Sequence, residues 1–145
     1  MRIIFNLFCM LIMAAYSGTY LHADCIDGDC KDGKGKYTWK NGAHYEGDFK
    51  GGAMNGTGSY TDEKGDQYTG EFKKSKLNGQ GRVIYKSGDI AEGNYVNSLL
   101  DGDGAILSKN GDRYKGQFKK GKKNGQGEFM FVNGDSYTGM FKDDF

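Results

Sequence analysis

The sequence predicts an all-β protein built from consecutive β-hairpins, and three observations support this fold class. A skeleton of aromatic residues and glycines returns every 23 residues. Within each copy of that skeleton, apolar and polar residues alternate with period two, which is the pattern of half-buried strands. Glycine-containing turn signals separate the alternating segments. A fixed period of this kind decides the architecture, because each copy is one supersecondary unit that packs against its neighbours.

The composition agrees with such a fold. A length of 145 residues predicts one domain. The chain has 25 glycines, no proline and 14% aromatic residues, which suits a repetitive sheet with glycine turns and an aromatic face better than a thick two-layer core. The net charge is +1, from 20 basic and 19 acidic residues. Nucleic-acid binding is therefore disfavoured, since it usually requires a clearly basic domain.

Residues 1–23 differ from the rest of the chain and are predicted to be a secretory signal peptide. Arg2 gives a minimal positive region, a largely apolar run follows, and Ala23 offers a small residue at the cleavage site. The apolar run is shorter than the ~18–20 residues that a spanning helix needs, and an uncleaved membrane anchor is the alternative. Cleavage predicts a periplasmic or secreted protein.

Residues 24–32 are predicted to form an N-terminal cap stapled by a disulfide. Cleavage after Ala23 would leave Cys25 and Cys30, and an even pair of cysteines in an exported chain indicates a disulfide. A metal site is the alternative. Structural zinc requires four ligands, however, and only His44 adds to the two thiols. We expect no metal and no cofactor.

The repeat array covers residues 33–145. It consists of a half copy at 33–44, full copies at 45–67, 68–90, 91–113 and 114–136, and a half copy at 137–145. Tyr68, Gly70 and Phe72 alternate with polar residues and predict one strand; a second alternating segment follows in the same copy. Asn-Gly pairs such as Asn110-Gly111 predict two-residue hairpin turns, because both positions tolerate positive φ.

Glycine recurs beside tyrosine and phenylalanine on one face of the predicted strands. Because glycine inside a strand normally weakens it, this recurrence predicts that a ring from one strand lies over the bare backbone of the next. Each pair of stacked rings would add ~0.5–1.5 kcal/mol beyond its buried area. Rings that stay exposed form a candidate binding face, on which sugar rings could also stack. Its members are Trp39, Tyr68, Phe72, Tyr85, Tyr114, Phe118 and Phe131.

These residues resemble the MORN repeat family. Its motif, Y-x-G-x-[FW]-x-x-G-x-x-x-G-x-G, is matched at every marked position by the segment Tyr114 to Gly127, and the resemblance extends from Gly33 to Phe141. The resemblance implies one elongated, twisted antiparallel sheet in a single layer. It also implies a module that mediates protein contacts and assembly, and in some members membrane or lipid association. The family has no catalytic residues of its own.

The third copy departs from this pattern. Ala91 replaces its first aromatic residue, and Leu99-Leu100 stands where the neighbouring copies have a lysine followed by leucine or by a second lysine. Ser75 and Ser98 replace a glycine of the motif. We therefore expect a gap or a bend near Ala91.

Charges are predicted to separate to the two edges of the sheet. Acidic residues lie in the glycine turns, at Asp66, Asp89, Asp112 and Asp135. Lysines lie in the opposite loops and form a candidate basic rim, comprising Lys73, Lys74, Lys76, Lys119, Lys120, Lys122 and Lys123. One interpretation is that these side chains only keep the sheet soluble. The other is that the basic rim binds anionic lipid or acidic protein surfaces.

Enzymatic activity is not expected, because the predicted mature chain has one histidine and no nucleophile–base arrangement. The leading hypothesis is an exported protein-interaction or scaffolding module. Association with anionic lipid and glycan binding are the alternatives. A strand at the C-terminal edge, ending at Phe145, could also pair with a partner and allow end-to-end self-association.

Overall fold

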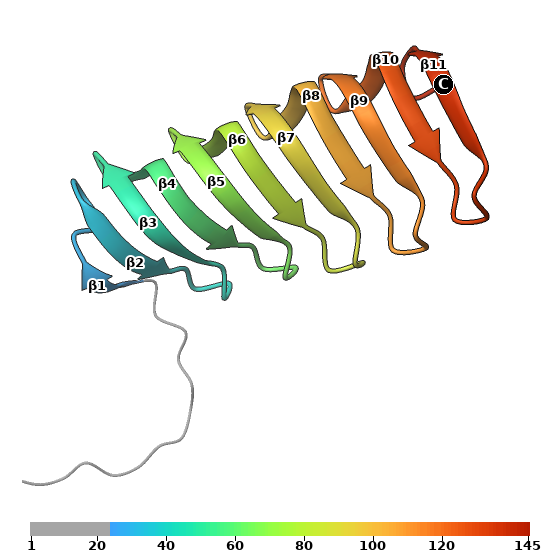
Figure 1. The fold of residues 1–145 in the computed structure, drawn as a ribbon. Coiled ribbons are helices and arrows are strands. Elements are labelled where there is room, and N and C mark those ends of the chain that lie inside the picture. Colours follow the sequence, from blue (N-terminus) through green and yellow to red (C-terminus); the bar gives the residue numbers. More distant parts are fainter. Residues whose placement is uncertain (1–23) are drawn as a thin grey trace, which may run out of the picture.

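The computed structural model describes residues 24–145, which form one open sheet of eleven antiparallel strands. The strands are β1 (Asp24–Gly28), β2 (Lys34–Thr38), β3 (His44–Lys50), β4 (Ala53–Thr61), β5 (Gln67–Lys73), β6 (Lys76–Ile84), β7 (Ile90–Val96), β8 (Leu99–Leu107), β9 (Arg113–Lys119), β10 (Lys122–Met130) and β11 (Ser136–Phe141). They pair in chain order, so the sheet is a single row of hairpins (Figure 1). The predicted fold class is confirmed.

Two kinds of connection join the strands from β2 to β11. They lie at opposite ends of the strands and so form the two long sides of the sheet, each of which we call an edge. At the first, which we call the tight-turn edge, two residues with positive φ close each hairpin, namely Gly51-Gly52, Lys74-Ser75, Asn97-Ser98 and Lys120-Gly121. At the second, which we call the loop edge, five residues connect the strands, namely 39–43, 62–66, 85–89, 108–112 and 131–135.

The prediction of two-residue turns at the Asn-Gly pairs is therefore wrong. In loop 108–112, the N–H of Gly111 donates to the carbonyl of Ser108 at 2.9 Å, and the N–H of Ser108 donates to the carbonyl of Asp112 at 2.8 Å. The side-chain oxygen of Asn110 accepts the N–H of Asp112 at 3.0 Å. Asparagine thus stabilises a wider loop with its side chain, and the glycine alone in that loop has positive φ.

Each long strand bends beside a β-bulge. In the β3–β4 hairpin the register shifts between Gly47 and Phe49. The ring centroids of Tyr45 and Phe49 lie only 5.0 Å apart, although four residues of straight strand span ~13 Å. The strand must therefore bend with these rings on the inside. We call this side of the sheet the aromatic face and the other side the polar face.

Side chains satisfy the backbone groups that the bulge removes from the ladder. The hydroxyl of Tyr45 donates to the carbonyl of Asp48 at 3.1 Å, and the carboxylate of Asp48 accepts the N–H of Thr57 at 2.9 Å. Burial, and then the charge of Asp48, raise the pKa of Tyr45 to about 12. At neutral pH the phenol therefore stays protonated and can donate this hydrogen bond.

The aromatic face carries the core of the protein. Its buried members are Tyr45, Phe49, Met54, Phe72, Leu77, Val83, Ala91, Tyr95, Leu100, Tyr114, Phe118 and Phe141. The packing of a ring onto glycine, predicted from the sequence, is confirmed at Tyr45 and Tyr114: a Cβ added at Gly58 or Gly127 would collide with the end of the ring.

In the two middle copies a leucine takes the place of this ring. A Cβ at Gly81 would lie 2.8 Å from Leu77, and one at the equivalent Gly104 would lie 3.2 Å from Leu100. The hydroxyl of Tyr95 donates to the carbonyl of Ala91 at 3.1 Å. Leu100 and Tyr95 fill the space that Ala91 leaves, and β7 pairs with both neighbours along its length. The row of ring contacts is interrupted near Ala91, as expected, because the ring pairs of the described residues end at Phe72 and resume at Tyr114.

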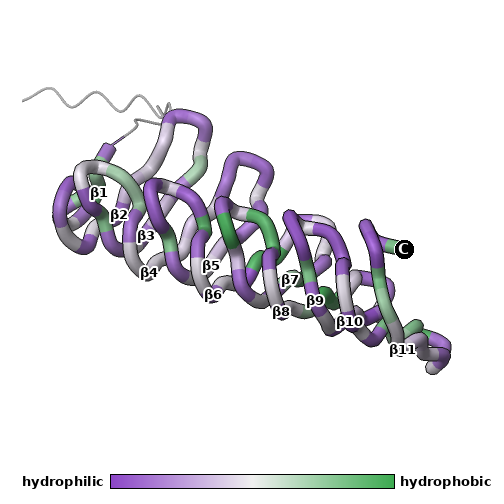
Figure 2. The backbone as a smooth tube through the Cα atoms, turned by 90° about the horizontal axis from the view of Figure 1, so that it is seen from above, coloured by the Kyte–Doolittle hydropathy of each residue, from purple (hydrophilic) through white to green (hydrophobic). Residues whose placement is uncertain are grey.

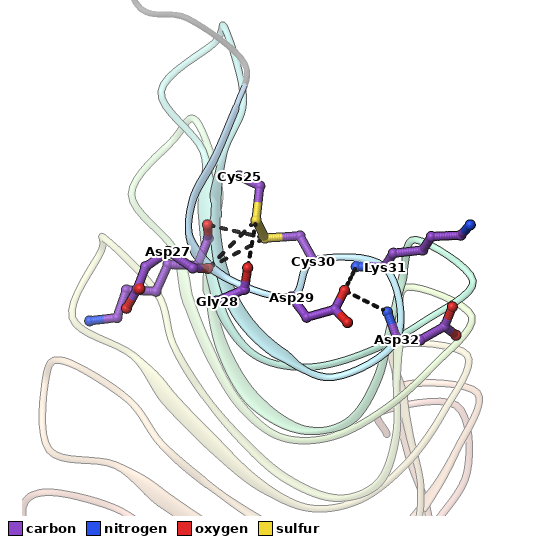
Figure 3. The surroundings of a disulfide bond; sticks show 8 residues. Cys25, Asp27, Gly28, Asp29, Cys30, Lys31 and Asp32 are labelled. Atoms are coloured by element: carbon purple, nitrogen blue, oxygen red, sulfur yellow. Dashed lines mark hydrogen bonds between the residues drawn. A yellow bond between two sulfur atoms is a disulfide. The ribbon is translucent and has the colours of Figure 1, made fainter.

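The segment predicted to be the N-terminal cap contains β1, the first strand of the described sheet. Cys25 and Cys30 are joined by a disulfide, as the sequence predicts (Figure 3). In the same cap, Asp29 accepts the N–H groups of Lys31 and Asp32 at 2.9 and 3.0 Å. These two hydrogen bonds, that of Asp32 first, lower the pKa of the Asp29 carboxyl. The predicted signal peptide, residues 1–23, lies outside the described residues.

We predict that Gly127→Ala destabilises the protein by about 3 kcal/mol, because a methyl group there would displace the buried ring of Tyr114. The matched control is Gly134→Ala in a loop, where no atom lies within 4 Å of the added methyl and only the φ of +94° opposes it. That variant should lose about 1 kcal/mol. Urea denaturation followed by fluorescence measures both changes. Equal losses would contradict the packing of the ring on glycine.

Candidate interaction surface

The polar face is the broad surface that the fold leaves open. Cross-strand pairing puts one row of side chains across its middle, namely Glu46, Ser59, Thr69, Arg82, Glu92, Ala105, Lys115 and Glu128. All of them except Ala105 are exposed. Within residues 24–145 the ion pairs are Lys34–Asp48 at 2.8 Å and Lys36–Glu46 at 3.1 Å. Most charges of this face are therefore free to meet a partner.

A second row of polar side chains maintains the bulges. The side-chain oxygen of Glu71 accepts the N–H of Gln80 at 3.2 Å, and that of Gln117 accepts the N–H of Gln126 at 3.0 Å. In the third copy, Asn94 instead donates to the carbonyl of Asp101 at 2.8 Å. These side chains follow the first aromatic position by three residues, as Asp48 does. Their role in the sheet is structural.

The residues of the predicted aromatic binding face lie in three different environments. Phe72, Tyr114 and Phe118 are buried, with exposed fractions of 5%, 2% and 4%. Trp39 and Tyr68 are half-buried and pack against the core cluster. Tyr85 and Phe131 are exposed, at 38% and 45%. The structure therefore does not bring the seven residues together as one accessible groove.

Six of the seven lysines of the predicted basic rim lie exposed at the tight-turn edge. Lys73 pairs with Lys76 across one turn, and Lys119 pairs with Lys122 across another. Lys123 differs, because it is half-buried on the aromatic face. Its ammonium lies 4.8 Å from the ring centroid of Phe129 and 5.5 Å from that of Tyr114. This position suits a cation–π contact.

The acidic residues of the loop edge connect successive hairpins. Three of the four carboxylates accept a backbone N–H of the next loop at 2.8 Å, in the pairs Asp66–Lys86, Asp89–Lys109 and Asp112–Val132. This role of the aspartates was not predicted from the sequence. The signal was available, because the aspartates recur with the repeat while solubility alone requires no fixed position.

The serines of the tight-turn edge form a similar connection. The side-chain oxygen of Ser75 accepts the N–H of Met54 at 3.2 Å, and that of Ser98 accepts the N–H of Leu77 at 3.2 Å. In return, the N–H of each serine donates to the carbonyl of the same residue, at 2.9 and 2.8 Å. Both edges therefore fix one hairpin against the next, which makes the polar face a rigid surface.

Aliphatic residues interrupt the polar face in the third copy. Val96 and Leu99 pair across the third tight turn and are 43% and 48% exposed. Figure 2 shows the strongest hydrophobic colouring of the backbone in the middle of the row, around β7 and β8. The residues described by the structure contain no group of His, Cys, Asp and Glu side chains suited to a metal ion. The same part of the chain has no helix that could cross a membrane.

Comparison with known proteins gives one family. A model described as MORN repeat matches residues 31–44, 45–67, 68–90 and 114–136, and it leaves the third copy unmatched. No curated protein matches the sequence. Among solved structures, the chain is similar to the SAS-4 (dCPAP) TCP domain of Drosophila melanogaster, in complex with a proline-rich motif of Ana2 (dSTIL). The identity is 15%, the alignment covers 90% of this chain and 86% of that chain, and the TM-score is 0.42.

We predict that Asp89→Asn lowers stability at neutral pH and that its difference from the unmodified protein closes as the pH falls. The N–H of Lys109, and then the hydroxyl of Ser87, lower the pKa of the Asp89 carboxyl. A lowered pKa stabilises the fold above the unfolded value of about 3.9, and this contribution is lost as the pH falls through the folded value. Thermal denaturation between about pH 7 and pH 2.5 measures the effect.

The control is Glu128→Gln, because the Glu128 carboxylate makes no hydrogen bond or ion pair within residues 24–145. A constant difference between Asp89→Asn and the unmodified protein over the whole pH range would contradict the role of the loop carboxylates.

Proposed function

Since the chain belongs to the MORN repeat family, whose repeats generally act as interaction modules, we propose that it is an exported, non-catalytic protein-interaction and scaffolding module. One observation carries the proposal. The sheet uses its aromatic side chains to build its own core, while the polar face stays exposed and is fixed along both edges. A rigid surface of this kind presents side chains at fixed distances, which lowers the entropy cost of binding.

Export is supported by two features of the N-terminal region. Residues 1–23 have the composition of a signal peptide. The cysteines that follow are joined in the structure, and disulfides persist in oxidising compartments such as a periplasm or the extracellular space. The proposed compartment is therefore outside the cytoplasm.

We predict that the protein isolated from its native host begins at Asp24 and contains no free thiol. N-terminal sequencing and thiol titration measure these two properties. A chain that keeps residues 1–23 would contradict cleavage and favour a membrane anchor.

We predict that amine- and carboxylate-reactive crosslinking in the native host joins the polar face to one recurrent protein partner. Lys115 and Glu92 are exposed reporters on that face. The control reporter is Lys64 on the loop edge, which should give fewer products.

A membrane partner would give a different result. The full chain would then sediment with anionic vesicles and not with neutral ones, and this binding would be lost when Lys119, Lys120 and Lys122 are replaced. That outcome, without a protein crosslink, would overturn the proposed protein partner.

A further inference from the structure

An aliphatic row crosses the polar face in the middle of the sheet. Ile84, Ile90 and Leu107 are direct cross-strand neighbours on β6, β7 and β8. Ile84 and Leu107 are each 36% exposed, and Ile90 is half-buried between them. The equivalent positions of the other copies are mostly polar, namely His44, Thr61, Gln67, Arg113, Met130 and Ser136. The repeat fold therefore does not require aliphatic side chains here.

At the other end of β7 and β8, aliphatic residues again stand where other copies have different side chains. Val96 on β7 and Leu99 on β8 are paired and exposed where the equivalent residues of the neighbouring full copies are lysines or alanine. Ile90 and Val96 are six residues apart on one strand, a separation of at most ~20 Å. The two aliphatic groups thus lie at opposite ends of a single band along β7 and β8.

The surface between the two groups is hollowed. Ala105 has a small side chain at a position where other copies have Ser59, Arg82 or Glu128. A hollow of about 440 Å³ lies at Ala105, Ile90 and Leu107. A second hollow of about 710 Å³ shares Ala105 and continues over the backbone of glycines 81, 93, 104 and 116. An extended segment could approach the bare backbone closely here.

The charges beside the band have one sign. The strands that flank it, β6 and β9, contain no acidic residue, and both carry cations on the polar face, namely Lys76, Arg82, Arg113, Lys115 and Lys119. These five side chains are exposed and form no ion pair within residues 24–145. The two strands of the band carry carboxylates at Glu92, Asp101 and Asp103, of which that of Asp101 accepts the N–H of Lys120 at 3.1 Å. A ligand that fits this band must therefore carry anionic groups that face β6 and β9, and hydrogen-bond donors that face the carboxylates of β7 and β8.

We propose that this band docks an extended acidic segment of a partner protein. This proposal rests on the interaction function proposed above. The segment lies along β7 and β8 with an apolar side chain at each end. Its carboxylates meet the lysines and arginines of β6 and β9, and its backbone N–H groups or a basic side chain meet Glu92 and Asp103. An anionic membrane fits less well, because it would press lipid phosphates against those two carboxylates.

Random-peptide display on the immobilised full chain tests the proposal. The enriched peptides should be acidic, with two apolar residues separated by several positions. Ile90→Gln combined with Leu107→Thr should weaken their binding by at least about tenfold. These replacements are the residues that other copies carry at the same positions, Gln67 and Thr61, so the variant should fold. Arg82→Ser combined with Lys115→Thr should weaken binding and reduce its dependence on salt.

The matched control is Met130→Thr, which removes an exposed apolar side chain at the equivalent position one copy later. It should leave peptide binding unchanged. Peptides that bind the Ile90→Gln, Leu107→Thr variant as well as the unmodified chain would overturn the docking band, as would peptides with no acidic bias or no enrichment at all. Binding to phosphatidylserine vesicles that the same variant abolishes would also overturn it, in favour of a lipid.

If the docking band is disproved, the proposed protein-interaction function can still be tested by itself. Crosslinking in the native host reports a protein partner anywhere on the polar face, whereas the peptide experiment reports only the band. A crosslinked partner together with peptides that ignore Ile90 and Leu107 would retain the interaction function and remove the band.

Discussion

The packing of a ring or a leucine onto bare glycine backbone is the contact on which the rest of this structure depends. It lets each strand bend, and the bend brings side chains four residues apart into contact, as at Tyr45 and Phe49. A one-layer sheet obtains a buried core in this way without a second layer. Because each ring contacts its own hairpin and the next one, stability accumulates from neighbour to neighbour.

This use of the aromatic side chains has a functional consequence. Phe72, Tyr114 and Phe118 are buried in the core, so their rings are not available to a partner, and we propose that recognition uses the polar face. The edges are partly structural as well. Loop aspartates and turn serines hold successive hairpins in position, and their hydrogen bonds keep the polar face rigid. The exposed side chains include the charges of the polar face, single rings such as Tyr85 and Phe131, and the aliphatic band along β7 and β8.

The third copy shows how a repeat protein can acquire a specific surface. The copy lacks the first aromatic residue, yet Leu100 and Tyr95 fill the space left by Ala91, and the sheet continues. Because its core is maintained by these substitutions, its polar face can carry different side chains without loss of the fold. The aliphatic band lies partly in this third copy, with Val96, Leu99 and Leu107, and partly at the end of the copy before it, with Ile84 and Ile90.

The sequence by itself determined the fold class, the length of the repeat, the disulfide and the contact of rings with glycine. These follow from periodicity and side-chain size, which are local properties of the chain. Only the tertiary structure decided which edge carries the two-residue turns, that Lys123 lies against aromatic rings, and that Ile84, Ile90 and Leu107 are neighbours. These features depend on strand register and on contacts between residues about 20 positions apart, which no single copy of the repeat contains.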